Sequence, residues 1–161
     1  FTMFYLNNSD DEEIEQANIK INNKILHQSK LINYLKLEKS KKDPTKDIND
    51  FLKKIKKNKK YFFSKKDVIL VEAFKSDGIK ILEKYNDLYQ INDSEIPSDI
   101  QIFVNSGDMA AALLRIVEII GQDNLNNIDE DTLYFIISTL NQLNADPLRN
   151  RILFKVLPLK V

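Results

Sequence analysis

The chain has 161 residues and no formal net charge at pH 7, because 24 Lys and Arg residues balance 24 Asp and Glu residues. Its 43% hydrophobic and 30% charged residues fit one soluble globular domain that is long enough to bury a core. The absence of cysteine excludes disulfides, thiolate metal sites and cysteine nucleophiles, and the low count of 3 Gly and 4 Pro favours helices joined by short polar loops.

The N-terminal residues 1–6 are mostly apolar but too few for a transmembrane helix or a whole signal peptide. They fit either the tail of such a segment or a short arm packed on the body. Because the chain begins at Phe1 without an initiator Met, we expect a processed chain, an excised domain or part of a longer protein. Frequent Lys, Asn and Ile indicate an AT-rich genome. The compartment stays open between export to a bacterial periplasm and the cytoplasm.

Residues 14–35 are predicted to form a long amphipathic helix that follows an acidic opening at residues 10–13. Its apolar seam carries Ile14, Ile21, Ile25, Ile32 and Leu35. Asn18 and Gln28 interrupt this seam and weaken coiled-coil pairing, so packing against the chain's own helices is favoured. His27, the only histidine, lies beside the seam without nearby partners that would give it a catalytic or metal-binding role.

A basic helical segment follows a polar connection at residues 36–46. We expect a short helix from Ile48 with Asp47 as its N-cap, because apolar residues recur at positions 48, 51, 52 and 55. Most other positions are lysines, and three aromatic residues follow at 61–63. The candidate partner-binding residues here are Lys53, Lys54, Lys56, Lys57, Lys59 and Lys60.

The next helix is predicted to begin after Ser64, which can form a capping box with Asp67. Residues 68–74 are apolar nearly all round, so this helix should be central to the core. Gly78 fits the left-handed position that ends a helix. Residues 81–89 are predicted to form another helix, and Pro97 opens a short one that stops near residue 106.

Three further helices are predicted at residues 109–120, 130–143 and from 146 to a stop at Pro158. Asp108, Asp129 and Asp146 are the expected N-caps, while Gly121 and Asn144 suit the ends of the first two. From the apolar faces we expect ten buried residues, which are Val71, Phe74, Leu113, Ile116, Val117, Ile120, Leu133, Ile136, Ile137 and Leu140.

The fold is therefore predicted to be all-α, a single unit of about seven helices that forms a helical array or bundle. Residues 70–79, 116–125 and 137–146 share the same helix-ending pattern, which fits an α-solenoid but equally any bundle with capped ends. Residues 106–114 and 140–150 resemble the C-terminal helical repeats of large, uncharacterised proteobacterial proteins. The resemblance implies an α-solenoid from a longer, exported protein. It carries over no catalytic residue and covers nothing before Val68.

No nucleotide-binding, zinc-protease, EF-hand or serine-hydrolase motif occurs in the chain, and we expect a non-enzymatic protein without cofactor or metal. Residues 129–131 form an acidic cluster that helix capping and the helix dipole explain. Arg115 and Glu118 are expected to form an exposed pair. Arg149 and Arg151 lie in a helix first turn, where basic residues are mildly unfavourable, so they are expected to meet a partner or an intramolecular carboxylate.

Charge divides the sequence into two parts. Residues 1–66 hold 16 basic and 9 acidic residues, net +7, and residues 67–161 hold 8 and 15, net −7. Either the two parts attract each other, or the basic part meets an anionic partner. The sequence predicts a helical interaction or scaffold module with a protein partner. The alternative is a lysine-driven binder of membrane surfaces or nucleic acid, although the basic segment has no arginine and matches no nucleic-acid-binding motif.

Overall fold

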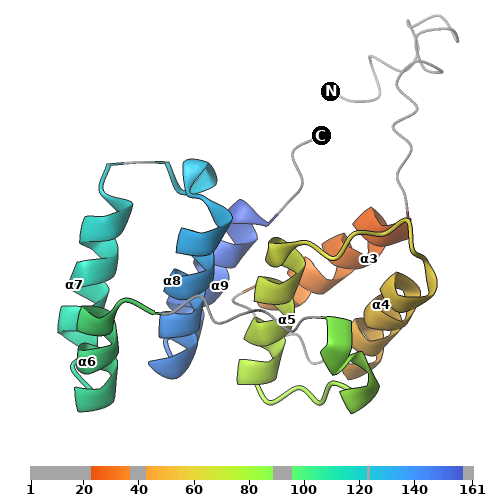
Figure 1. Cartoon of the computed structure of the whole chain (residues 1–161), viewed down its shortest axis with the longest axis horizontal. Helices are drawn as coiled ribbons and strands as arrows, with labels where there is room; N and C mark the ends of the chain where they lie inside the picture. The colour runs from red at the N-terminus through yellow and green to blue at the C-terminus, as the bar shows by residue number, and fades with distance from the viewer. Residues whose placement is uncertain (1–22, 37–42, 89–95, 123, 158–161) are drawn as a thin grey trace, which may run out of the picture.

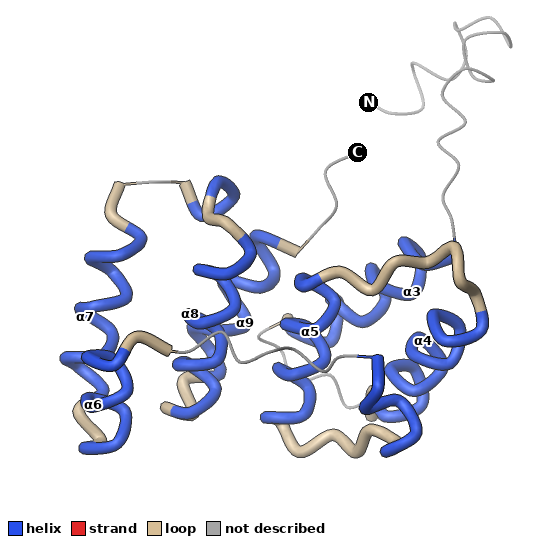
Figure 2. Tube along the Cα trace, viewed as in Figure 1, coloured by secondary structure: helices blue, strands red, loops and turns tan. Residues whose placement is uncertain are grey.

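A computed structural model describes residues 23–36, 43–88, 96–122 and 124–157, with the side chains of residues 23–27 left out. The protein is all-α, as predicted, and these ranges contain no strand (Figure 2). The α-helices are α3 (Asn23–Ile32), α4 (Thr45–Lys57), α5 (Lys65–Ser76), α6 (Ser98–Ser106), α7 (Met109–Ile120), α8 (Glu130–Gln142) and α9 (Asp146–Val156). Short 3-10 helices are η1 (Asn33–Leu35), η2 (Glu83–Leu88) and η3 (Leu125–Asn127).

The helices stand side by side in a row (Figure 1). Helices α6 and α7 pack together at one end, and α3 and α4 pack together at the other. Helices α5 and α8 pack against each other between these ends, and α9 packs against α8. The lysine-rich helix α4 and helix α7 therefore lie toward opposite ends of the molecule.

One hydrophobic core runs through the row and includes side chains from α3, α4, α5 and each later helix. Helix α5 is buried nearly all round, which confirms its predicted central place. Seven of the ten predicted core residues are buried, and Leu113 and Ile120 are partly buried against the core. The prediction for Val117 is wrong, because 62% of its surface is exposed.

Side-chain caps begin three of the helices as the sequence predicts. Ser64 and Asp67 form a reciprocal capping box at the start of α5. Asp108 accepts a hydrogen bond from the Ala111 amide at 3.0 Å. Asp129 accepts from two backbone amides at the start of α8. Each cap satisfies amide groups that have no partner within the first helical turn.

Two other predicted caps are wrong. Helix α4 begins at Thr45 rather than Ile48, so Asp47 lies inside its first turn. Asp47 instead accepts hydrogen bonds from the Lys30 ammonium at 2.7 Å and the Tyr34 hydroxyl at 2.6 Å. Helix α9 already includes Asp146, and the residue before it makes no side-chain cap. An aspartate near a helix start is favourable both at the N-cap and inside the first turn, so its tertiary partners decide which of the two positions it takes.

Glycine and asparagine end the helices where their backbone conformation is required. Gly78, Gly107 and Asn144 have positive φ angles of 81°, 73° and 53°. In each case the backbone amide of the following residue donates a hydrogen bond to a carbonyl in the last helical turn. The Ile79 amide, for example, donates to the Phe74 carbonyl at 3.0 Å. Residues 83–88 form only a 3-10 helix, so the longer helix predicted at 81–89 is not seen in the described part of that range.

The predicted helix at 14–35 is described only from Asn23 onward, where α3 is followed by η1. Gln28 is buried there, and its amide donates to Asp67 of the α5 capping box at 3.0 Å. An amide that was expected to weaken the seam thus joins α3 to α5. The apolar residues 1–6 and the acidic residues 10–13 lie outside the described residues. None of the helices described is long and apolar enough to cross a bilayer.

Candidate functional site

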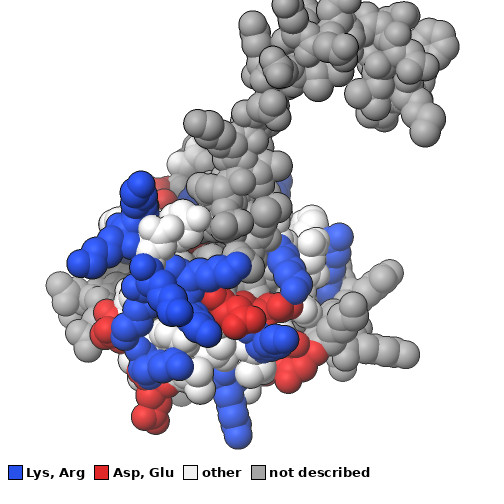
Figure 3. Space-filling view, turned by 90° about the vertical axis from the view of Figure 1, so that its right-hand side faces the viewer, with Lys and Arg blue, Asp and Glu red and all other residues white. Residues whose placement is uncertain are grey.

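The outer face of α4 carries three of the six predicted lysines. The opposite face, with Ile48, Phe51, Leu52 and Ile55, is buried against the body. Lys53, Lys54 and Lys57 are exposed on the outer face, and Lys59 and Lys60 are exposed in the loop that follows. Figure 3 views the end of the molecule formed by α3 and α4, where Lys and Arg side chains surround a smaller acidic group. The predicted split of α4 into an inner apolar and an outer basic face is confirmed.

Lys56 differs from its neighbours because it faces the chain's own acidic part. Its ammonium donates to the Lys84 carbonyl at 2.6 Å and to both carboxylate oxygens of Asp87 at 3.0 Å. Lys65 forms a second ion pair of this kind with Asp131 of α8. Attraction between the basic and acidic parts is therefore present at these two lysines, although pairs with exposed members contribute only about 0–1 kcal/mol each.

The aromatic residues after α4 have different environments. Tyr61 and Phe63 are partly buried and pack against the core, whereas the Phe62 side chain is 80% exposed. Hydrogen bonds from the Lys60 and Tyr61 amides to Asn58 define the turn before them. We call Lys53, Lys54, Lys57, Lys59, Lys60 and Phe62 the basic surface.

Arg149 does not belong to any exposed surface, contrary to its prediction as a partner-binding residue. Its side chain is 0% exposed, and its guanidinium lies 2.6 Å from Asp77 and 3.2 Å from Asp146. It also donates to the side chains of Asn141 and Asn150. The alternative prediction, an intramolecular carboxylate, describes its environment.

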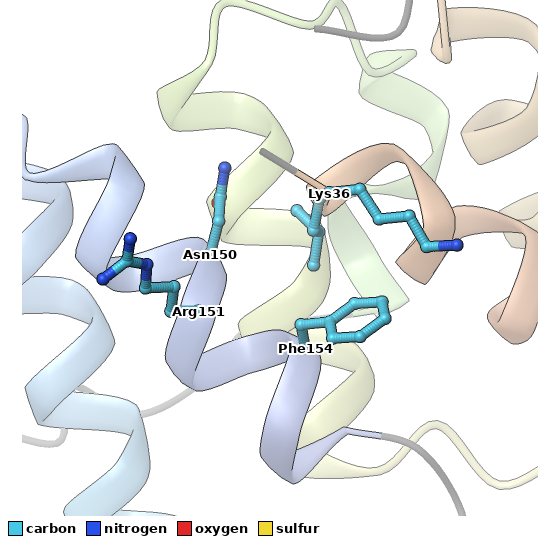
Figure 4. Close-up of a pocket in the computed structure, with 5 residues that line it drawn as sticks. Lys36, Asn150, Arg151 and Phe154 are labelled. Carbon is cyan, nitrogen blue, oxygen red and sulfur yellow. The ribbon is translucent and has the colours of Figure 1, made fainter. Parts of the chain in front are cut away.

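Arg151 is exposed beside a pocket of about 290 Å³ between η1 and α9. Leu35, Lys36, Asn150 and Phe154 complete the lining. Figure 4 shows Lys36 and Arg151 extending to opposite sides, with the Phe154 ring between them. The Lys36 ammonium lies 5.8 Å from the centre of that ring. Sequence reasoning missed this pocket because its two walls are more than 100 residues apart along the chain.

The outer side of α7 exposes apolar side chains. Ala112 and Ile116 are buried, whereas Leu114 and Val117 are 66% and 62% exposed. Arg115 pairs with Glu118 at 3.0 Å, as predicted, and with Asp99 of α6 at 2.7 Å. We call Leu114 and Val117, together with Ala110 one turn earlier, the α7 stripe. Sequence reasoning placed Val117 in the core and so did not identify this surface.

The acidic cluster at residues 129–131 serves helix capping. Asp129 accepts from the Thr132 hydroxyl at 2.6 Å, and this bond, followed by the bond from the Thr132 amide, lowers the pKa of the Asp129 carboxyl. Among the residues that the structure describes, no group of three or more His, Cys, Asp or Glu side chains is placed to hold a metal ion. The His27 side chain lies outside this set.

Comparisons of the chain with family models, curated proteins and solved structures give no match. The basic surface and the α7 stripe are the two exposed features of the described residues that suit a binding partner.

Proposed function

We propose that this chain is a non-enzymatic helical interaction module in which residues 67–161 are stacked as in an α-solenoid. The α7 stripe is the observation that carries this proposal. In a stacked array each helix buries its apolar face against its neighbours, and a terminal helix needs a polar outer side to stay soluble. Helix α7 stands at the end of the row, yet Leu114 and Val117 are mostly exposed there.

The partner that fits this stripe is a helix with an apolar face, from another protein or from a further repeat. Ala110, Leu114 and Val117 follow one another at steps of four and three residues, which places them on one side of α7. A small residue followed by two larger ones lets a partner helix approach closely at one point and interdigitate at the others. The interaction is expected to be mainly hydrophobic and therefore to persist at high salt.

A pull-down at low and high salt tests the proposal when it is paired with a stripe variant. The double variant Leu114→Gln/Val117→Gln should lose a protein partner that the unchanged chain retains in about 0.5 M NaCl, where exposed charges are screened. Leu82→Gln/Leu148→Gln changes two exposed leucines outside the stripe and should retain that partner. Equal retention by both double variants would reject the stripe as the contact surface.

A second function, binding of an anionic partner, is favoured by the basic surface. It brings five exposed lysines together at the end of the molecule that lies away from α7. Binding through these lysines should weaken as salt rises, because exposed charges are screened over a Debye length of about 8–10 Å at physiological salt. Replacement of Lys53, Lys57, Lys59 and Lys60 by Gln should abolish binding while the helical circular dichroism spectrum is unchanged.

A further inference from the structure

We propose that the basic surface binds the anionic face of a lipid bilayer, with the Phe62 ring inserted among the headgroups. This inference rests on the second function given above, because it names the anionic partner. Three features of the surface support it: an exposed aromatic ring, exposed lysines on α4 and in the loop that leads to this ring, and side-chain chemistry that suits headgroups better than bases.

The position of Phe62 is unfavourable in water. Its ring is 80% exposed, although the neighbouring Tyr61 and Phe63 pack against the core. The loop is thus held to the body on both sides of Phe62, while most of the Phe62 side chain stays exposed. Insertion at the boundary between headgroups and acyl chains removes this apolar surface from water, and aromatic side chains with nearby lysines are typical of proteins that lie on a membrane.

The lysines are placed so that they can reach a membrane surface together with Phe62. Lys59 and Lys60 precede it in the same loop, and Lys57 ends α4 directly before that loop. Long lysine side chains can extend to phosphate and carboxylate groups while their methylene stems cover apolar surface. Each lysine close to an anionic leaflet contributes about fivefold to binding.

Acidic groups near these lysines leave a positive balance. On α4 itself, Asp47 is occupied by Lys30 and Tyr34, and Asp50 is the other carboxylate. From the neighbouring elements, Asp87 is paired with Lys56 and Asp131 with Lys65. Neither of these pairs uses a lysine of the basic surface.

A bilayer suits this chemistry better than a nucleic acid. Arginine, which binds phosphate and bases in a two-pronged manner and stacks on bases, occurs only at positions 115, 149 and 151. Non-specific binding to single strands needs several aromatic rings in a groove, whereas this surface exposes one ring at a loop. Exposed lysines that precede a single exposed phenylalanine suit a surface of charged headgroups above an apolar interior.

The test uses the whole chain and vesicles of defined composition. The chain should co-sediment with phosphatidylcholine vesicles that contain about 30 mol% phosphatidylserine, and much less with phosphatidylcholine alone. Because the chain has no tryptophan, Phe62→Trp adds a single fluorescent reporter. Its emission should shift to the blue with the anionic vesicles and be quenched by brominated acyl chains. Leu82→Trp, at an exposed position directly before η2 rather than in this loop, should show neither change.

Two further variants separate the ring from the charges. Phe62→Ser should weaken vesicle binding about tenfold without changing the affinity for a DNA oligonucleotide. Lys59→Gln/Lys60→Gln should weaken vesicle binding about 25-fold, from two contributions of about fivefold each. The control Lys80→Gln/Lys155→Gln removes the same charge from exposed positions elsewhere and should change binding less than twofold.

The outcomes distinguish this inference from the function on which it rests. If the chain binds the oligonucleotide through the basic lysines but does not bind the vesicles, the second function stands and the bilayer inference is overturned. Vesicle binding that does not depend on Phe62, or an introduced tryptophan that stays in water, also overturns the inference. Binding to neither probe rejects both the inference and the second function.

Discussion

At the scale of single residues, Arg149 joins three helices from inside the molecule. Its guanidinium donates to Asp77 at the end of α5 and to Asn141 of α8, and Asp146 lies beside it in α9. Asp77 and Asp146 are 30% and 47% exposed, so the arginine is buried but its carboxylates still reach water. Removal of the arginine would therefore leave these carboxylates partly solvated rather than buried without a charged partner.

We expect Arg149→Met to lower the free energy of unfolding by about 2–3 kcal/mol. This lies below the roughly 3–5 kcal/mol that follows when one partner of a fully buried pair is removed. Arg151→Met, two residues away on the exposed side, should change it by less than about 0.5 kcal/mol. Urea unfolding measures both values. Equal effects of the two substitutions would show that Arg149 has no special structural role.

Asp47 makes stability depend on pH. Hydrogen bonds from Lys30 and then from Tyr34 lower the pKa of its carboxyl below the ordinary value of about 3.9. Since the folded pKa lies below the unfolded one, this contribution is fully present above the unfolded value and is lost as pH falls through the folded value. The hydrogen bond between Tyr34 and Asp47 also raises the pKa of the Tyr34 hydroxyl.

Asp47→Asn should thus destabilise the protein by about 1 kcal/mol at pH 7, the usual net value of such hydrogen bonds. The difference from the unchanged protein should shrink as the pH falls below about 4, because the carboxyl of the unfolded chain then takes up a proton before the folded one does, and it should be lost once the pH has fallen through the folded pKa. Urea unfolding at pH 7, 5 and 3 follows this difference. A difference that is the same at all three pH values would contradict the linkage.

At the scale of helices, burial separates α8 from α7. Leu140 of α8 is fully buried, whereas Leu114 of α7 is mostly exposed. Leu140→Ala should cost about 2–5 kcal/mol, because it leaves a cavity in a packed core. Leu114→Ala, the same chemical change, should cost less than about 0.5 kcal/mol. Thermal unfolding of both variants checks the assignment, and a small loss at Leu140 would mean that α8 is packed differently.

Helix starts and ends were predictable where the capping residue interacts only with backbone groups close to it in the sequence. Asp108 and Asp129 cap the helices that follow them, and Gly78 ends α5, because each interaction involves only nearby backbone groups. The cap predicted at Asp47 failed because Lys30 and Tyr34, far away in sequence, bind that carboxylate. Local patterns do not contain this information.

The candidate surfaces were predictable only in part. The lysines of α4 were expected on the outside, since the apolar positions of that helix fix its inner face. Phe62 could not be distinguished from Tyr61 and Phe63, because three aromatic residues in a row give the same signal. Val117 was predicted to be buried because it belongs to the apolar face of its helix. It is exposed because α7 carries more apolar residues than the neighbouring helices cover. A surplus of this kind becomes visible only when the neighbouring helices are known.

At the scale of the whole molecule, burial is unevenly distributed along the row of helices. Helix α5 has 12 residues, of which seven are buried, whereas α7 has the same length and buries two. Helix α6 buries only Ile100. Parts of a protein with few buried apolar side chains open locally at lower free energy than the rest. The hairpin of α6 and α7 should therefore be the least stable part of the described array.

Native-state hydrogen exchange tests this expectation directly. Backbone amides of α5 and α8 should exchange only through global unfolding, and those of α7 should exchange at least about tenfold faster through opening of the α6–α7 hairpin. Low concentrations of urea should accelerate the α7 amides less than those of α5, because a smaller surface is exposed in the local opening. A partner helix on the α7 stripe would slow the α6–α7 amides selectively, since it binds only the closed form. If α7 amides exchange as slowly as those of α8 without a partner, the hairpin is part of one cooperative unit, and its exposed stripe does not mark an incomplete end of the array.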